Sequence, residues 1–289
     1  MLQLTYKVRA KNTSAESENR IHDDAVAATY GFRGGLVPGV TVYAYMTAPI
    51  VAKFGLKWLE RGSMQVRFLK PCYDDDHLTV RATVKNGDGP VEADMRVEGN
   101  DGTLCASGLA ALNSGSQPLG NPWPEEFPET PMPEIDRRPD AIPESFVVGA
   151  PLGTLNETLD LSDTAGLDSI NERLTFYRGA KAVAHPFTLL GLVNQALMCN
   201  YKLGPWIHAS SELVNWSTAR DGERISVRSR IRECFERKGN DYVVIDALLL
   251  ANQQRVVQQV RHTAIYRPRR RQDSGSGNLF NTGSLESLR

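Results

Sequence analysis

Two long apolar segments, residues 38–54 and 186–201, stand out along the chain, and each begins with a proline. Proline is favoured in the first turn of a helix, where its missing N–H has no helical partner to lose. Both segments are apolar on all sides rather than along one stripe, which is typical of helices buried inside a fold. The pattern therefore predicts two buried helices.

Runs in which apolar and polar residues alternate follow each of these segments, and a similar run opens the chain at residues 1–7. Alternation with a period of two indicates half-buried antiparallel strands. The predicted strands cover residues 64–68, 78–84 and 92–97 in the first half, and 212–216, 225–231, 242–250 and 256–266 in the second. One long helix against several antiparallel strands, present twice, is an α+β arrangement.

The two halves of the chain also repeat each other in sequence. A shift of 148 residues aligns Pro38 with Pro186, Trp58 with Trp206 and Phe68 with Trp216. After a gap of one residue, the strand-like segment 78–81 falls on 225–228. A proline, an aromatic pair and a strand that match in the same order indicate an internal duplication, which decides the fold.

A proline-rich segment separates the two halves. Eight prolines lie between residues 118 and 143, and proline removes a backbone donor and fixes φ. The segment is therefore predicted to be an extended linker, partly polyproline II, over residues 117–145. The predicted domains are 1–116 and 146–268, and the polar, basic residues 269–289 are predicted to form a disordered tail.

Composition narrows the class of protein. The 33 basic and 34 acidic residues leave a formal net charge of −1, which gives no support for binding nucleic acid. The longest apolar run contains Pro49 and is shorter than the roughly 20 residues that span a bilayer, so no membrane span is predicted. The first residues show no signal peptide, and the four cysteines show no metal or disulfide spacing. A cytoplasmic protein with free thiols is expected.

Candidate chemistry gathers before the first long helix. His22 lies in a polar loop, and a short helix over 24–30, capped by Asp23 or Asp24, is predicted to follow it. Gly34, Gly35 and Gly39 allow a ligand to approach the backbone. The first N–H groups of the long helix have no intrahelical partner and lie at the positive end of its dipole, where a developing oxyanion is stabilised.

This segment resembles the hydratase motif of the MaoC-like family of (R)-specific enoyl hydratases and 3-hydroxyacyl dehydratases. The residues that carry the resemblance are Asn19, Ile21, His22, Asp24, Gly31, Phe32 and Gly39. The resemblance implies a double hot-dog fold, in which each antiparallel sheet wraps a long helix. It also implies that His22 is the catalytic histidine, Asn19 the motif asparagine, and Gly39 the residue whose N–H faces the thioester carbonyl.

Two positions depart from the family pattern. The aspartate that pairs with the catalytic histidine is replaced by Ser17, and the motif proline is replaced by Arg20. A serine hydroxyl does not ionise near neutral pH and cannot act as the carboxylate. Either Glu16, Glu18 or Asp24 replaces it, or His22 works alone. The second half has no histidine at the matching position, so it is expected to shape the acyl pocket rather than carry the chemistry.

The expected function is an acyl-thioester hydro-lyase, which hydrates 2-enoyl or dehydrates 3-hydroxyacyl thioesters of coenzyme A or an acyl carrier. Catalytic roles are predicted for His22, Asn19, Ser17 and Asp24, and substrate binding for Gly34, Gly35, Pro38 and Gly39. No metal or cofactor is expected, and exposed sheet edges are compatible with a homodimer. Thioester hydrolysis and non-catalytic acyl binding are the alternatives. His185, His208 and His262 are given no catalytic role.

Overall fold

The computed structural model describes residues 1–85, 91–112 and 119–270. The first half contains five strands, β1 (Leu2–Arg9), β2 (Gly62–Phe68), β3 (His77–Lys85), β4 (Val91–Gly99) and β5 (Leu104–Leu112). Its helices are η1 (Arg20–His22), α1 (Asp24–Thr29), α2 (Gly39–Phe54) and α3 (Leu56–Arg61). The predicted buried helix of this half is therefore confirmed as α2, and the predicted short helix as α1.

The second half repeats this order. Its strands are β6 (Leu155–Thr158), β7 (Ile207–Asn215), β8 (Arg224–Arg237), β9 (Asn240–Ala251) and β10 (Arg255–Arg267). Its helices are α4 (Ala165–Ser169), η5 (Thr175–Tyr177) and α5 (Pro186–Asn200), which is the second predicted buried helix. The duplication read from the sequence thus corresponds to a repeated succession of elements.

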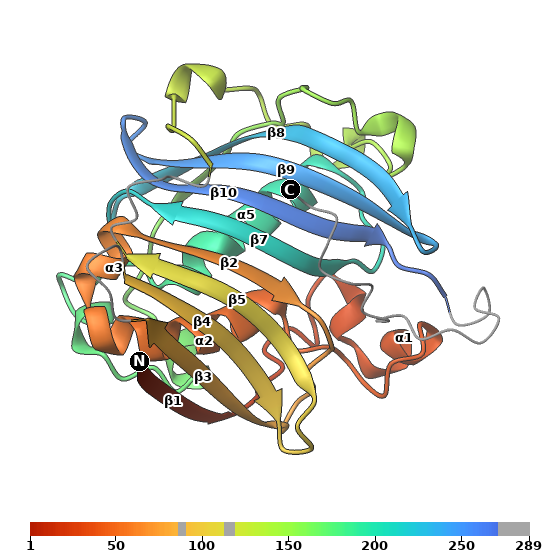
Figure 1. Cartoon of the computed structure of the whole chain (residues 1–289). Helices are drawn as coiled ribbons and strands as arrows, with labels where there is room; N and C mark the ends of the chain where they lie inside the picture. Colours follow the sequence, from red (N-terminus) through yellow and green to blue (C-terminus); the bar gives the residue numbers. More distant parts are fainter. Residues whose placement is uncertain (86–90, 113–118, 271–289) are drawn as a thin grey trace.

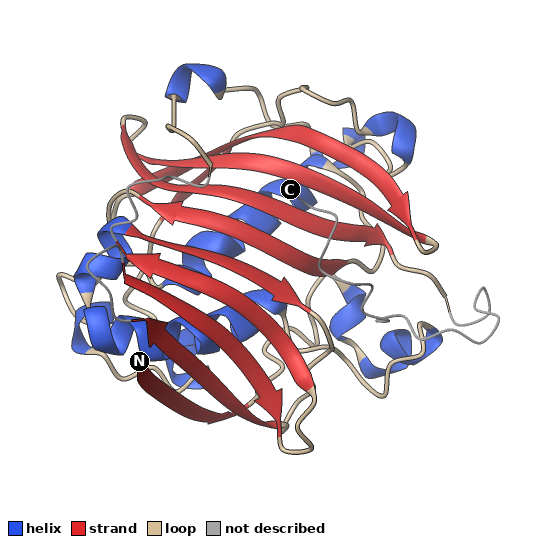
Figure 2. Cartoon of the chain, in the orientation of Figure 1, coloured by secondary structure: helices blue, strands red, loops and turns tan. Residues whose placement is uncertain are grey.

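The ten strands of the described residues form one antiparallel sheet in the order β1-β3-β4-β5-β2-β7-β10-β9-β8-β6 (Figure 1). The order within one half mirrors the order within the other, and β2 and β7 join them edge to edge. Their register places Ser63 opposite Val214 and Arg67 opposite Ser210. Figure 2 shows the two long helices, α2 and α5, on one side of this sheet. The predicted α+β, double hot-dog architecture is confirmed.

The two long helices lie against each other and against the sheet. Ten of the sixteen residues of α2 are buried, including Tyr43, Tyr45 and Met46, which explains why its sequence is apolar all round. Large aromatic and aliphatic side chains of this kind stabilise a fold by about 1.5–3 kcal/mol each when fully buried. None of the described helices is long and apolar enough to cross a lipid bilayer.

Several features differ from the sequence-based expectation, among them strand β6 and helix α4, which were not predicted. Strand β5 was not predicted, because its small residues hide the alternation. The short helix α3, which leads into β2, was also not predicted. The proline-rich segment, predicted to be extended, contains three single-turn helices, η2 (Pro124–Glu126), η3 (Ile135–Arg137) and η4 (Pro143–Ser145). Residues 117–118 of the predicted linker and 271–289 of the predicted tail lie outside the described residues.

Candidate active site

A cavity of about 230 Å³ lies between the two halves of the protein. The loop before α2 contributes Ser17, Asn19 and His22 to its wall, and the start of α2 contributes Pro38 and Gly39. The second half supplies residues of α5 and of the segment that begins β7. Residues of the predicted motif therefore line a cavity to which both halves of the protein contribute.

The imidazole of His22 is held in one orientation by its own loop. Its Nδ1 lies 2.6 Å from the backbone oxygen of Leu36. A carbonyl oxygen can only accept a hydrogen bond, so Nδ1 carries the proton and Nε2 keeps its lone pair. Burial lowers the pKa of His22 below its usual value, although the bond to Leu36 opposes this effect. A neutral imidazole with a basic Nε2 at a cavity is suited to proton abstraction.

Asn19 fastens the His22 loop to the second half. Its side-chain amide donates to the oxygen of Trp206 at 2.9 Å and accepts from the nitrogen of Trp206 at 3.1 Å. Its Nδ2 also lies 3.4 Å from His22 Nε2, a long contact. The predicted role of Asn19 in orienting His22 therefore has a structural counterpart, but the stronger bonds are those to the backbone before β7.

The isosteric substitution Asn19→Asp tests whether the bonds of Asn19 to the backbone of Trp206 stabilise the protein. The new carboxylate cannot donate and would face the oxygen of Trp206 in a buried place, since Asn19 is 6% exposed. We expect the free energy of unfolding to fall by about 1–3 kcal/mol. Denaturant unfolding measures the loss, and the exposed Asn121→Asp serves as the matched control. Equal stabilities of the two variants would show that the bonds of Asn19 to Trp206 do not stabilise the protein.

The N-terminus of α2 opens toward the same cavity. Pro38 precedes the helix and no side chain caps it. The N–H groups of Gly39 and Val40 have no partner within the helix, whereas those of Thr41 and Val42 donate to the backbone oxygen of Pro38. A Cβ added at Gly39 would lie 2.9 Å from both Cβ and Nδ1 of His208, so only glycine fits between this helix and β7.

Three of the predicted site residues lie away from the cavity wall. The exposed Asp24 accepts a hydrogen bond from the nitrogen of Gly35 at 2.7 Å, so its carboxylate braces the glycine turn instead of facing His22's cavity. A Cβ on Gly35 would lie 1.9 Å from the backbone oxygen of His22, and one on Gly34 would lie 3.1 Å from Asp24. These glycines let the chain fold tightly around His22 rather than contact a ligand.

Ser17, at the position of the family aspartate, does line the cavity. Its hydroxyl donates to the backbone oxygen of Asn19 at 3.3 Å. Among the described residues that line the cavity there is no aspartate or glutamate. Nor do the described residues include a group of three or more histidine, cysteine, aspartate or glutamate side chains placed to hold a metal.

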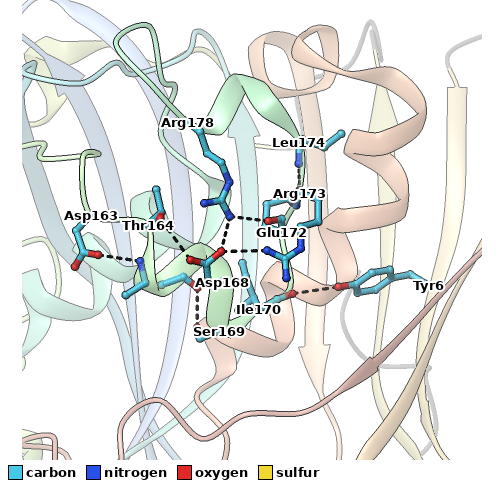
Figure 3. Close-up of polar contacts among 12 residues, drawn as sticks. Tyr6, Asp163, Thr164, Asp168, Ser169, Ile170, Glu172, Arg173, Leu174 and Arg178 are labelled. Atoms are coloured by element: carbon cyan, nitrogen blue, oxygen red, sulfur yellow. Dashed lines mark hydrogen bonds and ion pairs between the residues drawn. The ribbon is translucent and has the colours of Figure 1, made fainter.

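In the corresponding segment of the second half, the polar side chains form hydrogen bonds and ion pairs with neighbouring residues of the same segment (Figure 3). Asp168 pairs with Arg178 at 2.8 Å and with Arg173 at 3.2 Å. The buried His185 lies with its Nε2 3.4 Å from the Glu172 carboxylate, and its Nδ1 accepts from the backbone nitrogen that follows Pro186. Both nitrogens of His185 are thus occupied in holding the start of α5.

His208, which the sequence did not single out, lies on the cavity wall near the start of α2. It comes from β7, far along the chain from the motif, and the sequence pattern indicated only that it lies in or near a strand. The internal repeat could not identify His208, because the matching strand of the first half has no histidine. The contacts between the two halves, including the pairing of β2 with β7 and the packing of α2 on β7, bring it to this place.

Comparison with known proteins gives a consistent result for the fold. No family model matches the sequence, and no curated protein matches it. The structure is similar to that of a MaoC domain protein assigned as a dehydratase from Chloroflexus aurantiacus, with a TM-score of 0.65, 10% identity, and coverage of 93% of this chain and 95% of that one. It is also similar to Rv0216 from Mycobacterium tuberculosis, a double hot-dog protein, with a TM-score of 0.63, 14% identity, and coverage of 92% and 96%.

A protein assigned as an oleoyl thioesterase from Lactobacillus plantarum is similar as well, with a TM-score of 0.54, 9% identity, and coverage of 93% and 98%. At such low identities the likeness concerns the fold and not the reaction. The chain therefore has the double hot-dog fold, which it shares with MaoC-like dehydratases and with acyl thioesterases.

Proposed function

We propose that this protein is an acyl-thioester hydro-lyase, which adds water to 2-enoyl thioesters or removes it from 3-hydroxyacyl thioesters. The observation that carries the proposal is the neutral His22, whose basic Nε2 is presented at a cavity beside the open N-terminus of α2. A base and a set of unpaired amide donors are the two elements that this reaction needs.

Hydration then proceeds with His22 as the only proton carrier. Its Nε2 takes a proton from water as the water oxygen bonds to C3 of the enoyl group. The C2=C3 electron pair moves toward the thioester carbonyl, whose oxygen gains negative charge beside the first N–H groups of α2. The imidazolium returns the proton to C2, so one water has been added and His22 is neutral again.

This route accounts for the serine at position 17. A single imidazole that gives back the proton it has taken does not require a carboxylate partner, and none of the described lining residues supplies one. Thioester hydrolysis is the alternative function, because the fold is similar to that of a protein assigned as a thioesterase. It would direct the water activated by His22 to the carbonyl carbon instead of C3.

One assay separates these reactions. The purified protein is given 2-butenoyl-CoA, and loss of the conjugated enoyl absorbance is followed together with release of free thiol. Loss of absorbance without thiol release is the expected result. Release of thiol at the same rate would establish hydrolysis instead. Binding of the thioester without either signal would leave a non-catalytic acyl-binding protein.

The dependence of rate on pH follows from the state of His22. Because burial lowers its pKa below 6.5, the imidazole stays neutral and basic throughout the neutral range. We expect kcat/KM to be level around neutral pH and to decline only at pH values below 6.5, as His22 becomes protonated. Initial rates measured across this range check the prediction, and a decline that begins above pH 6.5 would contradict it.

A further inference from the structure

A buried chain of three polar side chains leads from the sheet to the wall of the cavity. His208 Nε2 lies 2.7 Å from the hydroxyl of Ser211, and this hydroxyl lies 3.3 Å from Nδ1 of His262. The two imidazole rings have centroids 4.3 Å apart. The three residues are 6%, 1% and 0% exposed, in that order, so water does not compete for their hydrogen bonds.

The remaining nitrogen of His208 has no hydrogen-bond partner among the described residues. Its Nδ1 is buried and makes no hydrogen bond within the described protein, although His208 lines the cavity. This nitrogen faces the start of α2, since it lies 2.9 Å from the position that a Cβ on Gly39 would occupy. A buried polar atom without a partner is costly, and at a cavity it points to a ligand atom that completes its bonding.

The chain also links the proton positions of the two histidines, because Ser211 can donate to only one of them at a time. Burial keeps His208 and His262 neutral, since it lowers both of their pKa values and sets that of His262 at about 3. Each ring therefore carries one proton. When Nδ1 of His262 donates to Ser211, the serine hydroxyl donates to Nε2 of His208, and the only proton of His208 is left on Nδ1.

We propose that His208 is a second catalytic residue, which donates a hydrogen bond from Nδ1 to the thioester carbonyl oxygen beside the N–H groups that begin α2. Ser211 and His262 are positioning residues that hold His208 in the tautomer able to donate. This inference rests on the proposed function and assigns that site a donor from the second half. No proton leaves His208, because the bond only stabilises the charge that forms on the oxygen.

A matched pair of substitutions tests the donor. In His208→Asn the side-chain amide reaches the place of Nδ1 and still donates, whereas His208→Leu has nearly the same shape and no donor. We expect kcat for 2-butenoyl-CoA to fall on the order of 10²-fold in the leucine variant, with KM little changed, and less than roughly tenfold in the asparagine variant. His77→Gln, an exposed histidine of β3, is the control. Equal losses in the two variants would overturn the inference.

A second measurement does not depend on turnover. Infrared difference spectra of bound butanoyl-CoA, labelled at the thioester carbonyl, report the strength of hydrogen bonds to that oxygen. We expect the carbonyl band to lie at lower frequency in the parent protein than in His208→Leu, with Ser211→Ala between them because its His208 is free to change tautomer. The same frequency in the parent and in Ser211→Ala would refute the positioning role, and this comparison decides the matter if the leucine variant does not fold.

The failure of this inference is distinguishable from failure of the proposed function. A parent that hydrates the enoyl thioester while His208→Leu is unimpaired overturns the role of His208 alone. A parent that binds butanoyl-CoA but turns over no thioester overturns the proposed function, and the carbonyl frequency then decides on His208 by itself. A parent that binds no acyl thioester overturns both.

Discussion

Replacing His22 with alanine is expected to lower kcat/KM for enoyl hydration by about 10²–10⁴-fold, the usual contribution of a positioned acid–base group. The loss should appear mainly in kcat, because Nε2 of His22 acts on water and on C2 and makes no contact that binds the thioester more tightly. Nδ1 lies 2.6 Å from the oxygen of Leu36, so part of the loop structure also depends on this ring. Progress curves with 2-butenoyl-CoA measure the effect.

Two controls separate chemistry from structure in this experiment. His77→Ala removes an exposed histidine of the same half and should leave the rate unchanged. His22→Asn keeps a donor for the oxygen of Leu36 but has no basic nitrogen, so it should retain the stability of the parent and lose its activity. A loss of less than roughly tenfold in both His22 variants would exclude His22 as the proton carrier.

Acid is expected to destabilise the fold well before the carboxylates are protonated, and His262 gives the largest defined effect. Its side chain is 0% exposed, and burial sets its pKa at about 3. In the unfolded chain a histidine has a pKa of about 6.5, so the unfolded state takes up a proton first as the pH falls. The stability that His262 contributes is therefore complete above pH 6.5 and is lost toward pH 3.

Between pH 7 and pH 5 this single group should lower the free energy of unfolding by about 2 kcal/mol. Burial lowers the pKa values of His185 and His208 too, and both add to the loss in the same direction. Urea unfolding at a series of pH values measures the total. His262→Asn should be less sensitive to pH than the parent by about 2 kcal/mol over this interval, while Thr263→Val, on the same strand, should keep the sensitivity of the parent. Identical sensitivity in all three proteins would show that His262 is not held neutral.

The main elements of the fold could be predicted because burial leaves a simple pattern in the sequence. Most residues of α2 and α5 are buried, so these helices are largely apolar all round, and most strands have one covered face and therefore alternate. Strand β5 lacks that pattern because it lies between β4 and β2 and is built largely of alanine, serine and glycine. Nothing in its local sequence distinguishes it from a loop.

The candidate site could be predicted only where it is local. His22, Asn19, Pro38 and Gly39 are close in sequence and do meet at one cavity. Asp24 was expected there as a possible acid, but its distance in sequence could not show that its carboxylate would bond to Gly35. His208 could not be found, because its place beside Gly39 depends on how the two halves pair.

The pairing of β2 with β7 also determines whether the two halves need the proline-rich connection to stay assembled. Strand pairing, the contact of α2 with α5 and the bonds of Asn19 to Trp206 hold the halves together without it. A protease that cut the backbone near the exposed Trp123 would therefore leave a nicked but assembled molecule. The two pieces, if made separately, carry complementary edges and would complete the cavity only on meeting, as in a split enzyme.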